Sequence, residues 1–162
     1  MQDVIVTVLG IQTDADGDKT RIETVANGKM RQKDGMHYIT YRERQEDGTE
    51  VATLIKASET AMTLVRHGQV VHEQRFEQAK RENGTYKPPS GTIRIAVDTH
   101  SFILSMTELS GSIFLTYDLH VEGQWQSHNE LSIKISRDHT LHVQKQEEYR
   151  HGYERTVEPR HH

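Results

Sequence analysis

The sequence of 162 residues contains no cysteine, only three prolines and no long apolar run. Without cysteine, no disulfide framework can hold the fold together, a composition that suits the cytosol. No apolar stretch approaches the roughly 20 residues that a transmembrane helix requires. Residues 1–9 lack the basic region and the longer apolar core of a signal peptide. We therefore expect a soluble, cytoplasmic protein.

Basic charge and apolar residues are also scarce. The chain has 20 Lys and Arg against 24 Asp and Glu, a net charge of −4. No cationic excess is available to neutralise a phosphate backbone, so we expect neither nucleic-acid binding nor a membrane partner. Apolar residues make up only 33% of the chain. An antiparallel sheet with one solvated face suits this composition, because only alternate residues then need to be apolar.

Signals for chain reversal are abundant. Five Asx-Gly pairs divide the sequence: Asp16-Gly17, Asn27-Gly28, Asp34-Gly35, Asp47-Gly48 and Asn83-Gly84. Asx-Gly is a strong hairpin signal, because both residues tolerate the positive φ that a type I′ turn requires. The pair Asn27-Gly28 lies inside a long run of β-formers, where it forms either a turn or a bulge that bends a strand.

Apolar and polar residues alternate with a period of two, which is typical of half-buried strands. The alternation is clearest from Ile113 to Val121. No segment shows a helical period with caps over ten residues. Residues 79–90 hold two of the three prolines, and we expect a loop or a short edge strand there. The expected strands lie at about residues 3–12, 19–32, 36–46, 49–57, 60–67, 70–78, 91–98, 101–107, 112–122 and 129–137.

Sequential strands with short connections predict an all-β protein, in which residues 1–143 form one domain. We expect an antiparallel up-and-down barrel of about eight to ten strands, because closure removes the exposed sheet edges. A two-sheet sandwich is the structural alternative. Residues 144–162 are expected to form a charged C-terminal tail, with a helix, a last strand extension and disorder all left open.

Several motifs along the chain form a familiar set. They are Gly68, Phe76, Gly84–Gly91, Gly111, Phe114–Val121 and Asn129–Ile133, together with Tyr38–Glu43 in the N-terminal half. On these residues the chain resembles the YwiB-like family of uncharacterised Firmicutes proteins, which are calycin-type β-barrels. The family's Thr-Pro-Tyr-Gly-like turn is matched after Tyr86 by the Pro and Gly of Pro88–Gly91. Its Thr and Tyr differ here. The resemblance spans roughly residues 3–137 and implies a closed, lipocalin-like barrel, but no activity.

One acidic segment, Asp14–Asp18, resembles the opening of a calcium-binding loop. Such a loop requires Gly at its sixth position and Glu at its twelfth, and these positions hold Lys19 and Val25. The segment therefore predicts a polar hairpin turn.

The histidines do not form a clear metal-binding pattern either. His139 and His142 are three residues apart, so they would point to opposite faces of a strand. The spacing of His120 and His128 does not favour a three-histidine zinc site. We predict no metal, no cofactor and no catalytic residue.

Four residues are the candidates for lining a ligand cavity: Tyr41, Arg75, Tyr86 and Tyr117. Tyr117 lies on the apolar face of its strand, and charge in mid-strand either faces water or lines a polar cavity. Arg42 follows Tyr41 directly, so at most one of the two faces inward. In the alternative arrangement the tyrosines pack in the core and the arginines are solvated outside.

Three functions remain open on this evidence. The first is a non-enzymatic barrel that binds a small, partly apolar molecule, since barrels of about eight strands can hold one small ligand. The second is a protein-interaction or homodimerisation module with a filled core, because the low apolar content leaves little to line both a core and a cavity. The third is an enzyme, which would require a cluster of perturbed titratable groups in one pocket.

Overall fold

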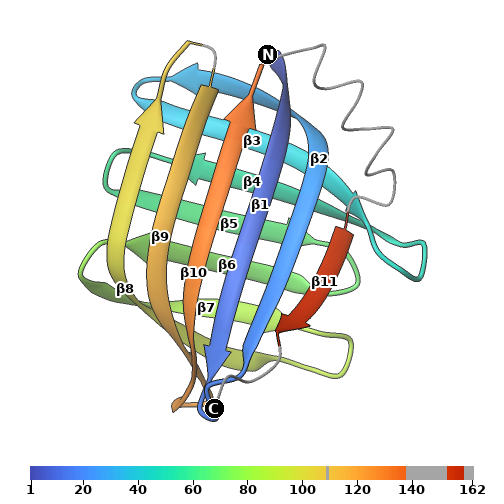
Figure 1. Ribbon diagram of the computed structural model, residues 1–162, viewed down its shortest axis with the longest axis vertical. Helices are drawn as coiled ribbons and strands as arrows, with labels where there is room; N and C mark the ends of the chain where they lie inside the picture. The colour runs from blue at the N-terminus through green and yellow to red at the C-terminus, as the bar shows by residue number, and fades with distance from the viewer. Residues whose placement is uncertain (109, 138–152, 159–162) are drawn as a thin grey trace.

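In a computed structural model, which describes residues 1–108, 110–137 and 153–158, the chain forms one antiparallel sheet (Figure 1). The strands are β1 (Gln2–Asp14), β2 (Lys19–Lys33), β3 (Met36–Arg44), β4 (Glu50–Ala57), β5 (Ala61–His67), β6 (Val71–Glu77), β7 (Lys80–Lys87), β8 (Ile93–Met106), β9 (Ser110–Val121), β10 (Gln124–Ser136) and β11 (Tyr153–Glu158). Each strand from β1 to β9 pairs with the next along the chain, and β1 also pairs with β10, which closes the ring. The expected closed barrel is therefore confirmed, with ten strands in the ring.

The C-terminal strand β11 lies alongside the first half of β2 (Figure 1), where Tyr153 pairs with Thr24 and Glu158 with Lys19. The rest of the expected tail, 144–152 and 159–162, lies outside the described residues, as do His139 and His142. In the described part of the chain, no helix is long and apolar enough to span a membrane.

The Asx-Gly pairs have two different roles. Gly17, Gly35 and Gly48 have φ values of 80°, 77° and 87°, as hairpin turns require. Asn27-Gly28 instead lies within β2, where Gly28 pairs with both β1 and β3. Asn83-Gly84 lies within β7 and pairs with β8 only. The expectation of a reversal at Asn83-Gly84 is wrong. At these two positions the glycine is needed because a Cβ would collide with a neighbour, such as the Thr40 carbonyl oxygen 2.6 Å from a Cβ on Gly28.

Three strand boundaries differ from expectation. Of the loop or short edge strand expected at 79–90, the structure has a strand, β7, which pairs with β8 over seven residues and with β6 over three, so it is not an edge strand. Its sequence is polar, so hydrogen bonding rather than apolar burial defines it. The expected strands 91–98 and 101–107 are one strand, β8, with an irregularity between Thr99 and Ser101. The last barrel strand begins at Gln124 rather than near residue 129.

The barrel interior has an apolar part and a polar end. The apolar part holds the largest fully buried side chains, among them Ile39, Ile55, Met62, Phe76, Ile113, Leu115 and Ile133. Each contributes on the order of 2 kcal/mol by leaving water. Toward the end at which β3 and β5 finish, the buried side chains become polar and include Thr24, Glu43 and Thr53.

Candidate functional site

A cavity of about 240 Å³ lies between the inward faces of β6, β7, β8 and β9. Its lining is mainly apolar and consists of His72, Gln74, Phe76, Tyr86, Ile93, Ile95, Val97, Tyr117, Leu119 and Val121. These residues alternate along each strand, so a single period of two places them all on the inner wall. The cavity is therefore a property of the barrel's inner surface rather than of a loop.

Two of the four candidate ligand-binding residues, Tyr86 and Tyr117, meet in this cavity. The ring of Tyr117 packs against Phe76 with centroids 4.8 Å apart. The ring of Tyr86 meets His72 edge to face at 5.8 Å. Aromatic pairs at these distances hold one another in place. Each of the two tyrosines is thus packed against another ring of the same cavity wall.

The third candidate, Tyr41, is buried in the core at 7% exposure and does not line this cavity. It borders a separate groove of about 740 Å³ that also includes Arg42 and His67. Burial, together with the charge of Glu43, raises the pKa of Tyr41, with Arg66 and Thr53 acting in the opposite direction. Tyr41 therefore remains protonated in the core.

The fourth candidate, Arg75, lies outside the barrel. Its side chain is 48% exposed, with Nη2 2.8 Å from Glu77 Oε1 and Nε 4.0 Å from Glu82 Oε1. Arg42 is also outside and lies 3.6 Å from Glu50. Both arginines therefore have solvated side chains on the outer face, as in the alternative arrangement considered from the sequence.

Gln74 is a cavity residue that the sequence analysis missed. It is 2% exposed, and its Nε2 donates to the carbonyl oxygens of Arg75 at 2.9 Å and Glu82 at 3.2 Å. The β6–β7 ladder covers only three residue pairs, so this amide joins the two strands where the ladder stops. Within the described residues, Gln74 Oε1 is a buried acceptor with no hydrogen-bond partner. The only sequence signal for this arrangement was Gly84, which leaves room for the amide.

A buried ion pair lies on the polar side of the interior. Arg66 Nη2 is 3.6 Å from Glu43 Oε1, and Thr24 Oγ1 donates to Glu43 Oε2 at 3.5 Å. Burial raises the pKa of Glu43, while Arg66 and Thr24 act to lower it. The pair balances its own charge and contributes no net charge to the barrel interior.

Two titratable groups of the cavity wall, His72 and Tyr117, are uncharged at neutral pH. Burial and the nearby Arg66 charge lower the pKa of His72 to about 4. Burial raises the pKa of Tyr117 to about 12. A neutral imidazole and a neutral phenol leave the wall able to exchange hydrogen bonds but unable to attract an ion strongly. The cavity is chemically suited to an uncharged molecule.

Two other features give weaker indications of a function than the cavity does. The segment Asp14–Asp18 is a polar hairpin, as expected, in which the Asp16 and Asp18 amides donate to Asp14 Oδ1 at 3.0 Å.

On the outer face, Ile103 and Phe114 pair across β8 and β9 and are 60% and 39% exposed. Nothing in the structure indicates what would cover this pair, so homodimerisation stays a prediction.

Comparison with known proteins agrees with the fold. Residues 6–133 match the model of a family described as a domain of unknown function (DUF1934). The uncharacterized beta-barrel protein YwiB of Bacillus subtilis (strain 168) is 32% identical over 113 residues, covering 70% of this chain and 78% of that protein. The crystal structure of the ywiB protein from Bacillus subtilis has a TM-score of 0.76 at 26% identity, covering 85% of this chain and 92% of that one. The resemblance to YwiB-like proteins is confirmed.

Proposed function

This chain belongs to the DUF1934 family, and from that premise we propose that it binds a small, uncharged, mostly apolar molecule inside the barrel. The site is the cavity between β6 and β9, defined above by its ten lining residues. The proposed role is binding without catalysis.

The size and lining of the cavity support this proposal. An apolar cavity of about 150 Å³ is large enough to bind benzene, so about 240 Å³ accommodates a substituted single ring or a short branched chain. Ligand sites are typically apolar walls with a few placed polar groups. Here the apolar wall is Phe76, Ile95, Val97 and Leu119, and the polar groups include Gln74.

The observation that carries the proposal is that Tyr86, Tyr117 and Gln74 line one mainly apolar cavity, and that the buried Oε1 of Gln74, packed against Gly84, has no hydrogen-bond partner among the described residues. A buried acceptor without a partner costs roughly 1–3 kcal/mol. A ligand that donates one hydrogen bond to Gln74 Oε1, after a side-chain rotation that turns this atom toward the cavity, would recover part of this cost. This argues for an occupant with one donor group on an apolar body.

Charge selects against ionic ligands. Moving an ion from water into this wall would be strongly unfavourable, because no free charge compensates it. His72 and Tyr117 are neutral at pH 7, and Arg66 is engaged by Glu43. Carboxylates and amines should therefore bind much more weakly than neutral molecules of the same shape.

Three single-ring probes test the proposal: benzene, phenol and benzoate. Their binding is measured by thermal shift and by isothermal titration calorimetry. We expect benzene and phenol to raise the melting temperature and benzoate to leave it unchanged. Phenol should bind about fivefold more tightly than benzene, the equivalent of one net hydrogen bond of about 1 kcal/mol. Equal shifts of the melting temperature with all three probes, or no shift with any of them, would contradict the proposal. Native mass spectrometry of protein purified without denaturation would then identify any molecule that is retained.

A further inference from the structure

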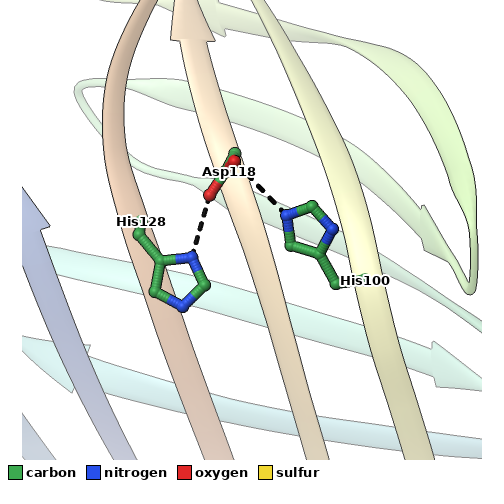
Figure 2. Close-up of side chains that lie close together, drawn as sticks. All are labelled: His100, Asp118 and His128. Atoms are coloured by element: carbon green, nitrogen blue, oxygen red, sulfur yellow. Dashed lines mark hydrogen bonds and ion pairs between the residues drawn. The ribbon is translucent and has the colours of Figure 1, made fainter.

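Three side chains from adjacent strands meet on the outer wall of the barrel: His100 of β8, Asp118 of β9 and His128 of β10 (Figure 2). His128 Nδ1 is 2.8 Å from Asp118 Oδ1, and His100 Nε2 is 3.3 Å from Asp118 Oδ2. The two imidazole rings are nearly parallel, at 26°, with centroids 6.1 Å apart. The cluster lies on the opposite side of the wall from the cavity residue Tyr117, which precedes Asp118 in β9.

Strand register and one irregularity create this cluster. Asp118 pairs directly with His128, so their side chains share the outer face. In β8 the register shifts between Thr99, opposite Tyr117, and Ser101, opposite Thr116. His100 is the extra residue at this shift, and bulges of this kind redirect a side chain. Because the shift depends on tertiary pairing, sequence reasoning alone does not place His100 beside the other two.

The donor atoms are spaced as metal ligands are. One atom each from His100, Asp118 and His128 lies within 4.8 Å of the other two. Around a first-row ion with bonds of about 2.0–2.2 Å, tetrahedral ligands are about 3.3–3.6 Å apart. Two imidazoles and a carboxylate on one side of an ion leave the remaining positions open to solvent. Only small side-chain rotations separate the present hydrogen-bonded arrangement from a coordinating one.

The charges around the cluster favour a cation. Asp118 lies directly opposite Asp98 of β8, and two carboxylates facing each other across a strand pair repel. Asp98 is balanced by Arg81 at 3.0 Å and approached by His120 at 3.6 Å. Within the part of the chain that the structure describes, Asp118 has only the two histidines as partners. Although burial acts to raise the pKa of Asp118, hydrogen bonds from His128 and His100 lower it overall. The carboxylate is ionised and suited to a cation.

We propose that His100, Asp118 and His128 bind a divalent transition-metal ion, with Zn²⁺ and Ni²⁺ as the fitting class. Imidazole ligands disfavour Ca²⁺ and Mg²⁺, which prefer oxygen. The ion would replace the two Asp118 hydrogen bonds, and each neutral imidazole would carry its proton on the nitrogen that faces away from the ion. The side chains of His100, His128 and Asp118 are 51%, 42% and 27% exposed, so solvent has access. This site is independent of the cavity proposed above.

Zinc titration of the metal-stripped full chain tests the proposal. We monitor the imidazole resonances of His100 and His128 by NMR, because other histidines of the chain would contribute to a purely calorimetric signal. One equivalent of ZnCl₂ should shift these two residues first. Asp118→Asn should weaken zinc binding at least about tenfold, as expected when a ligand is lost.

Two controls keep the outcome decisive. His67→Gln, at an exposed histidine of β5, should leave zinc affinity at His100 and His128 unchanged. The melting temperature of Asp118→Asn in EDTA should stay close to that of the parent, because an amide fits the same space and removes the repulsion by Asp98. Unmoved His100 and His128 resonances at one equivalent of zinc, or equal zinc affinity in Asp118→Asn, would show a hydrogen-bonded His-Asp-His cluster with no metal site.

Discussion

The side-chain amide of Gln74 in β6 fills the space that a Cβ on Gly84 in β7 would occupy. An ideal Cβ at Gly84 would lie 2.7 Å from Gln74 Cδ and 2.8 Å from the Glu73 carbonyl oxygen. Gly84 has no positive φ, so it is needed for space and not for backbone conformation. This contact closes the barrel wall where the β6–β7 ladder stops, and it places Gln74 in the cavity.

Gly84→Ala should therefore lower the free energy of unfolding by about 2 kcal/mol, the usual cost of overpacking. Urea denaturation measures it. The matched control is Gly10→Ala in β1, where a Cβ would meet nothing within 4 Å, and this variant should change stability by less than about 0.5 kcal/mol. A similar loss in both variants would mean that strand glycine itself, and not the Gln74 contact, determines the effect.

Arg66→Met should destabilise the protein at pH 7, because it leaves the buried Glu43 carboxylate without its cation. Removing one partner of a fully buried pair costs roughly 3–5 kcal/mol. Since the Arg66 side chain is 36% exposed, solvent screening reduces the expected loss to about 2 kcal/mol. The exposed pair of Arg42 with Glu50 supplies the control, and Arg42→Met should cost less than about 0.5 kcal/mol.

The loss in Arg66→Met should depend on pH in a defined direction. Burial raises the pKa of folded Glu43 above its ordinary value of 4.5, so the folded state holds this proton more tightly than the unfolded state. Stability from this group is therefore lost as pH rises above 4.5. Without Arg66 the shift grows, so the loss should be larger at pH 7 than at pH 5. An equal loss of stability at pH 5 and pH 7 would mean that Arg66→Met acts through packing and not through charge.

His72 should act in the opposite direction. Its pKa falls from 6.5 to about 4 on folding, through burial and then Arg66, so the unfolded state binds its proton more tightly. Stability is present above pH 6.5 and is lost as pH falls towards 4, by at most about 3 kcal/mol. His72→Phe, which retains a ring beside Tyr86, should reduce this loss. NMR titration of the His72 imidazole gives a direct check, and a midpoint near 6.5 would refute the assignment.

The general architecture could be predicted from the sequence because it depends on local signals. Period-two alternation marked the strand from Ile113 to Val121, and Gly35 and Gly48 marked true turns. The same signals placed Tyr117 on the inner face, where it lines the same cavity as Tyr86. These are properties of single strands and hairpins, and they carry into the closed barrel.

The rest depended on pairing between strands. β7 has little apolar character and is defined by its ladder to β8, so its composition suggested a loop. Gln74 became a cavity residue because the β6–β7 ladder stops beside it. His100 reaches Asp118 only through the register shift in β8. A single sequence does not show which strands pair or at which register. Because β7, Gln74 and His100 all depend on strand pairing, their roles could not be predicted.

Filling the cavity should abolish ligand binding without unfolding the barrel. Leu119→Trp adds a large ring to a partly buried position on the cavity wall. Its matched control is Ile103→Trp, on the outer face of the neighbouring strand at 60% exposure. Thermal shift with phenol should show a response in the parent and in Ile103→Trp, and none in Leu119→Trp. Retained binding in Leu119→Trp would move the ligand site elsewhere.

The most direct test of the cavity is methyl NMR of the protein with benzene. Ile95, Val97 and Val121 carry methyl groups on the cavity wall, and a ring bound there would shift their resonances strongly and saturably. We expect saturable shifts at these methyl groups in the parent and in Ile103→Trp, and their loss in Leu119→Trp. Cavity methyl groups that do not respond to benzene, or that respond equally in Leu119→Trp, would contradict a ligand cavity in this barrel.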